Sequence, residues 1–315
     1  MELIITLGLA LDLLLGEPRW LPHPVIIVGQ FIAGAEKFIR RVTSSPQGLR
    51  LAGALLTLTL TVGTFFVFWF FLKAAYYFSD YLGFILSVIF MFQALAVKSM
   101  IEHAGQVITA LKDRDLIRAR QRLGQIVGRN TEGLDEAEIS RGAVESVAEN
   151  TVDGIVAPLF YAFIGGPPLA MAYKVANTLD SMLGYKDENY RHLGWAPAKF
   201  DDLVNLIPAR LTGLWFLVIS PFTRGGFKGV YKSITMDAPG HPSPNGGIPE
   251  AAVAGALQVQ LGGVNYYGDK PSFRQTMGPG NERLQMKHIQ YSLYLMGVAT
   301  FLTWLAGVLI LRLVI

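Results

Sequence analysis

Long apolar runs alternate with polar stretches along the chain, and the longest runs have the length of a membrane span. A spanning helix needs about 20 apolar residues. Residues 51–72 and 291–310 meet this requirement, and residues 82–97 form a shorter but uncharged run. Residues 3–15 are either a thin spanning helix or an interfacial one. The pattern predicts an all-α polytopic integral membrane protein, organised as a single membrane-embedded domain over residues 1–315.

Two further apolar runs contain helix breakers and are expected to be re-entrant or spanning. Residues 155–173 include the sequence Gly-Gly-Pro-Pro, which cannot continue a regular helix. Residues 206–220 include Pro208 and Arg210. Irregular backbone at membrane depth is tolerated only inside protein or beside a cavity. We therefore expect broken segments near a functional site.

The polar loops indicate an orientation in the membrane. Lys and Arg number eight in residues 98–153, four in 174–204 and seven in 221–289, but only one in 73–81. The positive-inside rule places the basic loops in the cytoplasm and the connector 73–81 outside. We therefore predict a cell (inner) membrane protein with a cytoplasmic active face, in which both broken segments enter and return. Within these loops, residues 98–128 are predicted to form one amphipathic helix. A second helix is predicted to start near Asp135, and no strand-rich region is expected.

Composition supports this prediction and excludes several chemistries. Hydrophobic residues make up 51% of the chain and charged residues 16%, with a mean hydropathy of +0.37. A soluble domain carries about 25% charged residues. The chain has no cysteine, which excludes disulfides, thiolate catalysis, iron–sulfur clusters and cysteine zinc sites. The net charge of +3 comes without a basic block interleaved with aromatic residues, so no nucleic-acid partner is expected. The N-terminal apolar run lacks a basic leader and a cleavage site, so we do not interpret it as a signal peptide.

An acidic stripe precedes the first broken segment. Arg141, Glu145, Glu149 and Asp153 are four residues apart and share one helix face. The stripe is either a solvated face with pairs such as Arg141–Glu145, or a face that handles Mg²⁺ and a nucleotide. Mg²⁺ favours a few carboxylate oxygens together with substrate phosphates. The three acids are candidate catalytic residues, and the flanking candidates for substrate binding are Arg129, Asn130, Thr131 and Asn150.

A second polar face lies on the apolar helix that follows the Gly-Gly-Pro-Pro sequence. Polar stripes that emerge from membrane-depth segments are usually functional, although a hydrated helix face inside a bundle is the alternative. The catalytic candidates here are Lys174 and Asp180, and the substrate-binding candidates are Asn177, Ser181 and Tyr185. Asp201 and Asp202 are either metal ligands or an ordinary surface pair.

A third candidate is the Gly/Pro-rich loop in DAPGHPSPNGGIPEAAVAGAL, residues 237–257. A loop of this kind that runs into a helix presents backbone N–H groups to a phosphate, although it is also compatible with a rigid turn. No Gly-Lys-Ser/Thr follows, so it is not a Walker A sequence. His241 is either catalytic or structural, and the binding candidates are Ser243, Asn245, Gly246 and Gly247. A further cluster, Asp12, Glu17, Arg19 and His23, surrounds Trp20 and is typical of an interfacial anchor.

Together these blocks resemble the adenosylcobinamide-phosphate synthase family of cobalamin biosynthesis, the CbiB/CobD type, over nearly the whole chain. The blocks that carry the resemblance are residues 11–25, 128–161, 173–186, 200–213 and 237–257. The resemblance implies a multi-pass inner-membrane ligase that joins (R)-1-aminopropan-2-ol, or its O-phosphate, to the free carboxyl of adenosylcobyric acid. An amide is formed and ATP is consumed. The implied partners are the corrinoid and amine substrates, the lipid bilayer and other membrane-bound enzymes of cobalamin biosynthesis.

This reaction gives each candidate group an expected role. A carboxylate must be activated before an amine attacks it, most simply as an acyl phosphate, and Mg²⁺ neutralises the phosphate charge. We expect Glu149, Asp153, Asp201 and Asp202 to be the metal ligands, Arg129 and Lys174 to contact phosphates, and His241 or an acid to take the proton of the amine. The aromatic loop 185–197 would form a wall for the corrinoid.

Two other functions fit the same pattern. Broken membrane segments and buried polar stripes are typical of a secondary transporter for a cation or a small polar metabolite. The large share of loop-like sequence and the lack of a visible inverted repeat argue against a transporter. A scaffold for other membrane-bound cobalamin enzymes is compatible with the ligase and would be inactive when purified.

Overall fold

The structure is a computed structural model that describes residues 1–16, 24–185, 187–268 and 270–314. Glu17, Arg19, Trp20 and His23 of the expected N-terminal anchor lie outside the described residues. The chain divides into two compact units. Unit 1 contains Met1–Ala96, Ala157–Asn205 and Ala306–Ile315, and unit 2 contains Val97–Val156 and Leu206–Leu305. The single-domain organisation stays a prediction.

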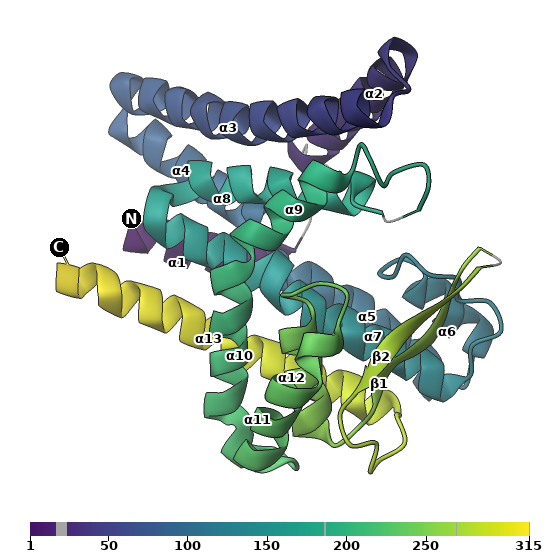
Figure 1. Cartoon of the computed structure of the whole chain (residues 1–315). Coiled ribbons are helices and arrows are strands. Elements are labelled where there is room, and N and C mark those ends of the chain that lie inside the picture. Colours follow the sequence, from purple (N-terminus) through teal and green to yellow (C-terminus); the bar gives the residue numbers. More distant parts are fainter. Residues whose placement is uncertain (17–23, 186, 269, 315) are drawn as a thin grey trace. The chain divides into compact units, whose positions relative to one another are not determined.

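Unit 1 is built from long apolar helices that pack side by side (Figure 1). Its elements are α1 (Glu2–Leu15), α2 (Pro24–Val42), α3 (Pro46–Phe78), α4 (Asp80–Ala94), α8 (Ala157–Leu183), α9 (Trp195–Val204) and the end of α13 (Met286–Val314). The Ser45 side chain caps α3 by accepting a hydrogen bond from the N–H of Gly48. Gly8 lets α1 approach α4 closely, because a Cβ there would lie 2.6 Å from Cγ of Met91. The core between α2, α3 and α8 contains Ile32, Leu49, Val175, Leu179, Leu183 and Leu193.

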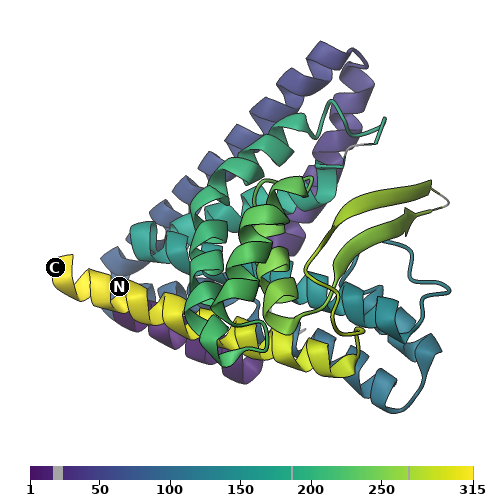
Figure 2. The same ribbon diagram turned by 60° about the horizontal axis from the view of Figure 1, so that its bottom comes forward.

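Unit 2 combines shorter helices with one antiparallel hairpin (Figure 2). Its helices are α5 (Val97–Lys112), α6 (Leu116–Leu123), α7 (Glu136–Thr151), α10 (Leu206–Ile219), α11 (Gly226–Met236), α12 (Gly247–Leu257) and the start of α13. A π-helical turn, η1 (Val152–Val156), follows α7, and short 3₁₀ turns are η2 (Ser220–Phe222) and η3 (Ala238–Gly240). The strands are β1 (Leu261–Tyr267) and β2 (Lys270–Met277), with an irregularity between Leu261 and Gly263.

Helix α12 is the most buried helix of unit 2. It is rich in alanine and packs against α7, α10 and α11. Small residues let the neighbouring backbones approach, since a Cβ on Gly255 would lie 2.6 Å from the carbonyl oxygen of Gly229. Glu250 is the single charged residue in this helix, and it is buried.

In the part of the chain that the structure describes, four helical runs are long and apolar enough to cross a bilayer: Pro46–Phe78, Asp80–Lys112, Glu136–Leu183 and Met286–Leu313. The bent pair Trp195–Val204 and Leu206–Phe222 would add a fifth span. These runs confirm the predicted all-α polytopic architecture. Helix α1 has 14 residues, which at the rise of an α-helix is about 21 Å, shorter than the hydrocarbon core.

The observed starts and breaks of the helices confirm some of the predictions from the sequence and contradict others. Asp135 caps α7 as predicted, because its side chain accepts a hydrogen bond from the N–H of Glu138 at 2.8 Å. The predicted break in 155–173 is confirmed by the non-helical Gly165 and Gly166, the latter at φ 69°. The single helix over 98–128 is wrong, because the chain turns after α5 with Arg114 at φ 56° and Asp115 then caps α6. The hairpin was not predicted, because β1 begins with glycines and β2 is mostly exposed, so neither strand shows an alternating apolar pattern.

Candidate functional site

The acidic stripe meets arginine side chains inside unit 2. Oε2 of Glu145 accepts a hydrogen bond from Nη1 of Arg129 at 2.6 Å, and both side chains are less than a tenth exposed. Oε1 of Glu145 accepts from the backbone N–H of Gly262 at 2.8 Å and lies 3.8 Å from Nη1 of Arg141. The positive partners of Glu145 are therefore two arginines. We had expected Mg²⁺ to neutralise this part of the stripe.

Arg129 keeps unused donors although it is buried. Its Nη1 also donates to Oδ1 of Asn265 on β1 at 2.6 Å. Nε and Nη2 of Arg129 and Nδ2 of Asn265 have no hydrogen-bond partner among the described residues. Leaving a buried donor unsatisfied costs about 1–3 kcal/mol, so such groups call for a functional or structural explanation. These three donors are suited to an anionic oxygen of a substrate.

Arg141 has a structural role in this arrangement. Its Nη1 donates to the carbonyl of Gly262, and its Nη2 donates to the carbonyl of Val264 at 3.0 Å. These bonds attach β1 to α7 and so fix Asn265 beside Arg129. A guanidinium stays charged in proteins, so Arg141 binds these carbonyl oxygens as a cation.

Glu250 on α12 extends the cluster. Its Oε1 lies 3.7 Å from Nε2 of His241 and 3.9 Å from Nη1 of Arg274 on β2. Its Oε2 has no hydrogen-bond partner among the described residues. Burial, followed by the negative charges of Glu145 and Glu149, raises the pKa of Glu250 well above its usual value. We call Arg129, Arg141, Glu145, Glu149, His241, Glu250, Asn265 and Arg274 the charge cluster.

Sequence reasoning missed three members of this cluster: Glu250, Asn265 and Arg274. Asn265 and Arg274 carry no local signal, because the hairpin that positions them was not predicted. Glu250 does carry one, since a lone acid in an alanine-rich helix is unusual in a buried setting.

The other predicted residues of the stripe lie on its open side. Glu149 is exposed and Asp153 is half-buried. Asp153 belongs to the π-helical turn η1, which shifts the residues after it around the helix axis, and such turns are frequent at functional sites. Nδ2 of Asn150 donates to the carbonyl of Ser146 at 2.9 Å.

The Gly/Pro loop has a geometry that argues against a cradle of backbone N–H groups. The N–H groups of Asn245 and Gly246 donate to Oγ of Ser243 at 3.3 and 3.2 Å, and that of His241 donates to the carbonyl of Ala238. These donors are used inside the loop. The side chain of Asn245 accepts from Nη1 of Arg210 at 3.2 Å, which attaches the loop to α10. His241 is the loop residue that reaches the charge cluster.

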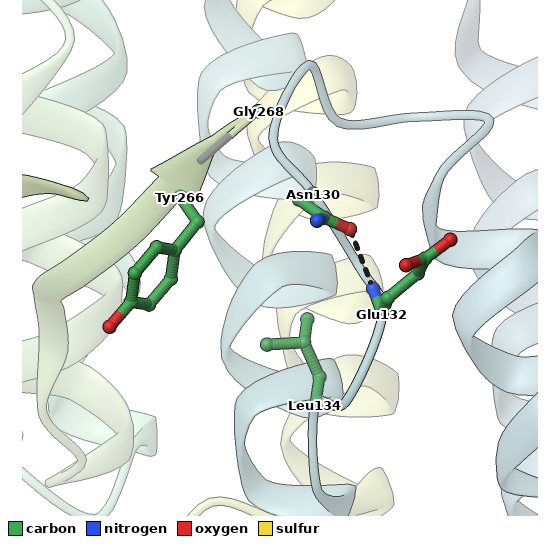
Figure 3. A pocket seen from close by; sticks show the side chains of 5 residues that line it. All are labelled: Asn130, Glu132, Leu134, Tyr266 and Gly268. Carbon is green, nitrogen blue, oxygen red and sulfur yellow. Dashed lines mark hydrogen bonds between the residues drawn. The ribbon is translucent and has the colours of Figure 1, made fainter. Parts of the chain in front are cut away.

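A small pocket opens between the loop that precedes α7 and strand β1 (Figure 3). Its volume is about 250 Å³. The N–H of Asn130 donates to the carbonyl of Tyr266 at 2.7 Å, and Oδ1 of Asn130 accepts from the N–H of Glu132 at 2.9 Å. Sites for drug-sized ligands span roughly 300–1,000 Å³, so this pocket fits only a small group. The pocket is lined by Asn130, Glu132, Leu134, Tyr266 and Gly268, and the predicted Thr131 is half-buried within the same loop.

Unit 1 contains the second predicted polar face. Oδ1 of Asp201 lies 3.3 Å from Nδ2 of Asn177, and Oδ2 accepts from Nδ2 of Asn205 at 2.9 Å. Oδ1 of Asn205 in turn accepts from the hydroxyl of Tyr173 at 2.9 Å. This chain of hydrogen bonds joins α8 to α9 and includes Asn177 of the predicted polar face together with Asp201.

A family model and the curated relatives show the family of this chain. The family model described as CobD/Cbib protein matches residues 5–296. The cobalamin biosynthesis protein CobD of Geobacter metallireducens is 48% identical over 276 residues, 87% of this chain and 86% of that protein. CobD of Clostridium tetani is 41% identical over 295 residues, 93% of this chain and 92% of the relative. No solved structure matches. The chain belongs to the CobD/Cbib family.

Asp201 and Asp202, two of the expected metal ligands of this CobD/Cbib protein, have different partners. Asp201 points to Asn177 and Asn205, whereas Asp202 lies 3.3 Å from Nζ of Lys199. Neighbouring residues on a helix point about 100° apart, which explains the divergence. Within the described ranges, no group of three or more His, Asp or Glu side chains could hold a metal ion.

The remaining predicted residues of this CobD/Cbib protein are accessible. Lys174 and Asp180 on α8 are half-buried, and Ser181 is exposed at the end of the same helix. Tyr185 is exposed, and its ring centroid lies 5.7 Å from that of Tyr190.

Proposed function

We propose that this protein acts in cobalamin biosynthesis as an ATP-dependent amide-forming ligase. The substrates would be adenosylcobyric acid and (R)-1-aminopropan-2-ol or its O-phosphate. The CobD names of its relatives support the pathway. The observation that supports this type of reaction is the set of buried, unpartnered donors on Arg129 and Asn265 within a cluster of carboxylates.

The reaction divides into two balanced steps. In the first, an oxygen of the corrinoid carboxylate attacks the γ-phosphorus of ATP, which gives an acyl phosphate and releases ADP. In the second, the amine attacks the acyl carbon, an amide bond forms and phosphate leaves. Both steps gather negative charge on phosphate oxygens, which a preorganised guanidinium stabilises. Nε and Nη2 of Arg129 would supply that contact, because Nη1 is already held by Glu145 and Asn265.

Mg²⁺ fits this site only with substrate phosphates as co-ligands. The exposed Glu149 and the half-buried Asp153 are the carboxylates that would hold it. Two carboxylates are compatible with Mg²⁺, which keeps several waters and phosphate oxygens in its shell. When bound, it would neutralise charge on the transferring phosphoryl group.

Aromatic side chains in unit 1 support binding of a large, partly apolar corrinoid. Tyr185 and Trp195 are each 48% exposed. The guanidinium of Arg50 lies 5.9 Å from the Trp195 ring centroid, and that of Arg40 lies 5.2 Å from the Tyr190 ring centroid. Exposed rings with neighbouring cations would present apolar faces and charges to a corrin and its carboxamides.

A reconstituted reaction tests the proposal. The detergent-solubilised protein would be incubated with adenosylcobyric acid, ATP, Mg²⁺ and either amine, and the corrinoid product identified by mass spectrometry. We expect an amide product together with one ADP per amide, and none when ATP is omitted. An Arg129→Gln variant that remains folded should lose the product. Absence of amide with either amine, together with ATP-independent solute uptake into proteoliposomes, would instead support a transporter.

A further inference from the structure

Glu250 occupies an unusual position in unit 2. It is 1% exposed and is the single charged residue of α12, which is packed between α7, α10 and α11. A buried carboxylate is normally satisfied by hydrogen bonds or close ion pairs. Here Nε2 of His241 and Nη1 of Arg274 lie 3.7 and 3.9 Å from Oε1, and Oε2 has no hydrogen-bond partner among the described residues.

The surrounding cations do not form a close ion pair with Glu250. The charged groups that act on Glu250 are the carboxylates of Glu145 and Glu149 and the guanidinium groups of Arg129 and Arg274. Three carboxylates therefore face two guanidinium groups. Arg129 is already paired with Glu145 at 2.6 Å, and Arg274 lies 3.9 Å from Oε1 of Glu250, beyond hydrogen-bond distance. Neither guanidinium group gives Oε2 of Glu250 a hydrogen bond.

We propose that Glu250 binds the primary ammonium group of the amine substrate through Oε2 and accepts one of its protons when the amide bond forms. This assignment rests on the proposed function. An ammonium carries one positive charge and three donors, which suits a buried carboxylate whose Oε2 has no hydrogen-bond partner among the described residues.

The chemistry of amide formation requires this proton acceptor. A primary alkylamine has a pKa near that of lysine, roughly 10, so at neutral pH it is mostly an ammonium and cannot attack. One proton passes from the ammonium to Oε2 of Glu250. The nitrogen then bonds to the acyl carbon, the bond between that carbon and the phosphate oxygen breaks, and the second proton leaves with the phosphate. The raised pKa of Glu250, caused by burial and by Glu145 and Glu149, makes its carboxylate a better base.

Steady-state kinetics with Glu250→Gln test the catalytic part. We expect kcat/KM for the amine to fall about 100-fold or more, within the range for loss of a general base. The KM values for ATP and the corrinoid should change little. Glu282→Gln is the matched control, because Glu282 is a partly buried acid of unit 2 that pairs with Lys287 at 3.0 Å. A Glu250→Gln variant that retains wild-type kcat/KM would overturn the proposal.

A binding experiment keeps the proposal testable without turnover. The amine and its analogue with a hydroxyl in place of the amino group would be titrated against the folded, detergent-solubilised protein by thermal shift. Wild type and Glu250→Asp should prefer the amine, and Glu250→Gln should bind both compounds alike. A wild type that does not distinguish the two compounds would disprove the assignment even if Glu250→Gln fails to fold. Failure of the proposed function is a separate result, namely a wild type that makes no amide from ATP.

Discussion

At the scale of single residues, Glu145 and Glu149 have different surroundings although they lie four apart on α7. Glu145 is buried against Arg129 and also accepts from the N–H of Gly262. Glu149 is exposed. A buried acid with these partners serves stability, whereas an exposed acid beside the cluster is available to a substrate. Two acids at the regular spacing of the stripe, Glu145 and Glu149, therefore have different roles.

Substitution of each acid by glutamine should separate these roles. Removing one member of a buried ion pair costs about 3–5 kcal/mol, so Glu145→Gln should lower the melting temperature and the yield of folded protein. Glu149→Gln, like Asp153→Asn, should leave melting nearly unchanged and abolish or strongly reduce amide formation. Thermal unfolding in detergent and the ATP-dependent assay would measure both effects. Glu36→Gln is a control for stability, because Glu36 forms an i,i+4 pair with Arg40 in unit 1. Equal melting temperatures of Glu145→Gln and Glu149→Gln would contradict the assignment of a stabilising role to Glu145 and a functional role to Glu149.

The pKa of Glu250 predicts a dependence of stability on pH. Burial and the charges of Glu145 and Glu149 raise this pKa in the folded state above its usual value of 4.5. The folded state therefore binds the proton more tightly than the unfolded state. This contribution to stability is complete below pH 4.5 and is lost as the pH rises through the folded-state pKa. Melting temperatures measured from pH 4 upward should fall more steeply for wild type than for Glu250→Gln. Parallel curves would show that Glu250 keeps an ordinary pKa.

At the scale of elements, local features were predictable and long-range partners were not. The cap of α7 depends on Asp135 and Glu138, which are three residues apart, so the sequence contains the whole signal. Arg129 and Asn265 are 136 positions apart, and they meet only because the hairpin folds against α7. The charge cluster could therefore be predicted on its α7 side but not on its α12 and hairpin sides.

Packing, and not an unusual backbone conformation, explains the glycine at position 247 of the Gly/Pro loop. Positive φ is a common reason for glycine in a loop, but Gly246 has φ −60° and neither it nor Gly247 is among the positive-φ residues. Gly247 is required for close packing instead, because a Cβ there would lie 2.6 Å from both the carbonyl oxygen of Ala238 and Cβ of His241. At Gly246 the nearest atom, Cε1 of His241, is 3.1 Å away.

This packing predicts a graded response to alanine. Gly247→Ala should destabilise the protein by about 1–3 kcal/mol, the usual cost of overpacking. Gly246→Ala should cost less, and Ser243→Ala should alter the loop through lost hydrogen bonds to Asn245 and Gly246. Because Gly247 touches His241, its variant should also raise the KM for the amine more than that for ATP. A Gly246→Ala variant that is less stable than Gly247→Ala would refute the packing argument.

At the scale of the whole molecule, composition and run length were sufficient to predict a polytopic helical protein. The apolar runs 51–72 and 291–310 lie inside helices of 33 and 29 residues, because a helix satisfies its own backbone groups in lipid. The ends of these helices extend beyond the apolar runs, and run length alone does not specify such extensions. Residues 155–173 lie within the helical run Glu136–Leu183, which is long enough to span.

The orientation of the polar segments is the last prediction, and it depends on how residues 155–173 meet the membrane. The Lys and Arg counts place residues 98–153 and 174–204 together in the cytoplasm, so this segment must enter and return. Glu132→Cys and Ser181→Cys test both sides of it, because both residues are exposed and the chain has no cysteine of its own. A membrane-impermeant thiol reagent should label neither variant in intact cells and both after permeabilisation. A cysteine in the connector 73–81, such as Ser79→Cys, should be labelled from outside and serves as the positive control. Labelling of Ser181→Cys alone in intact cells would show that residues 155–173 cross the bilayer, and it would place Asp180 on the outer face, away from cytoplasmic ATP.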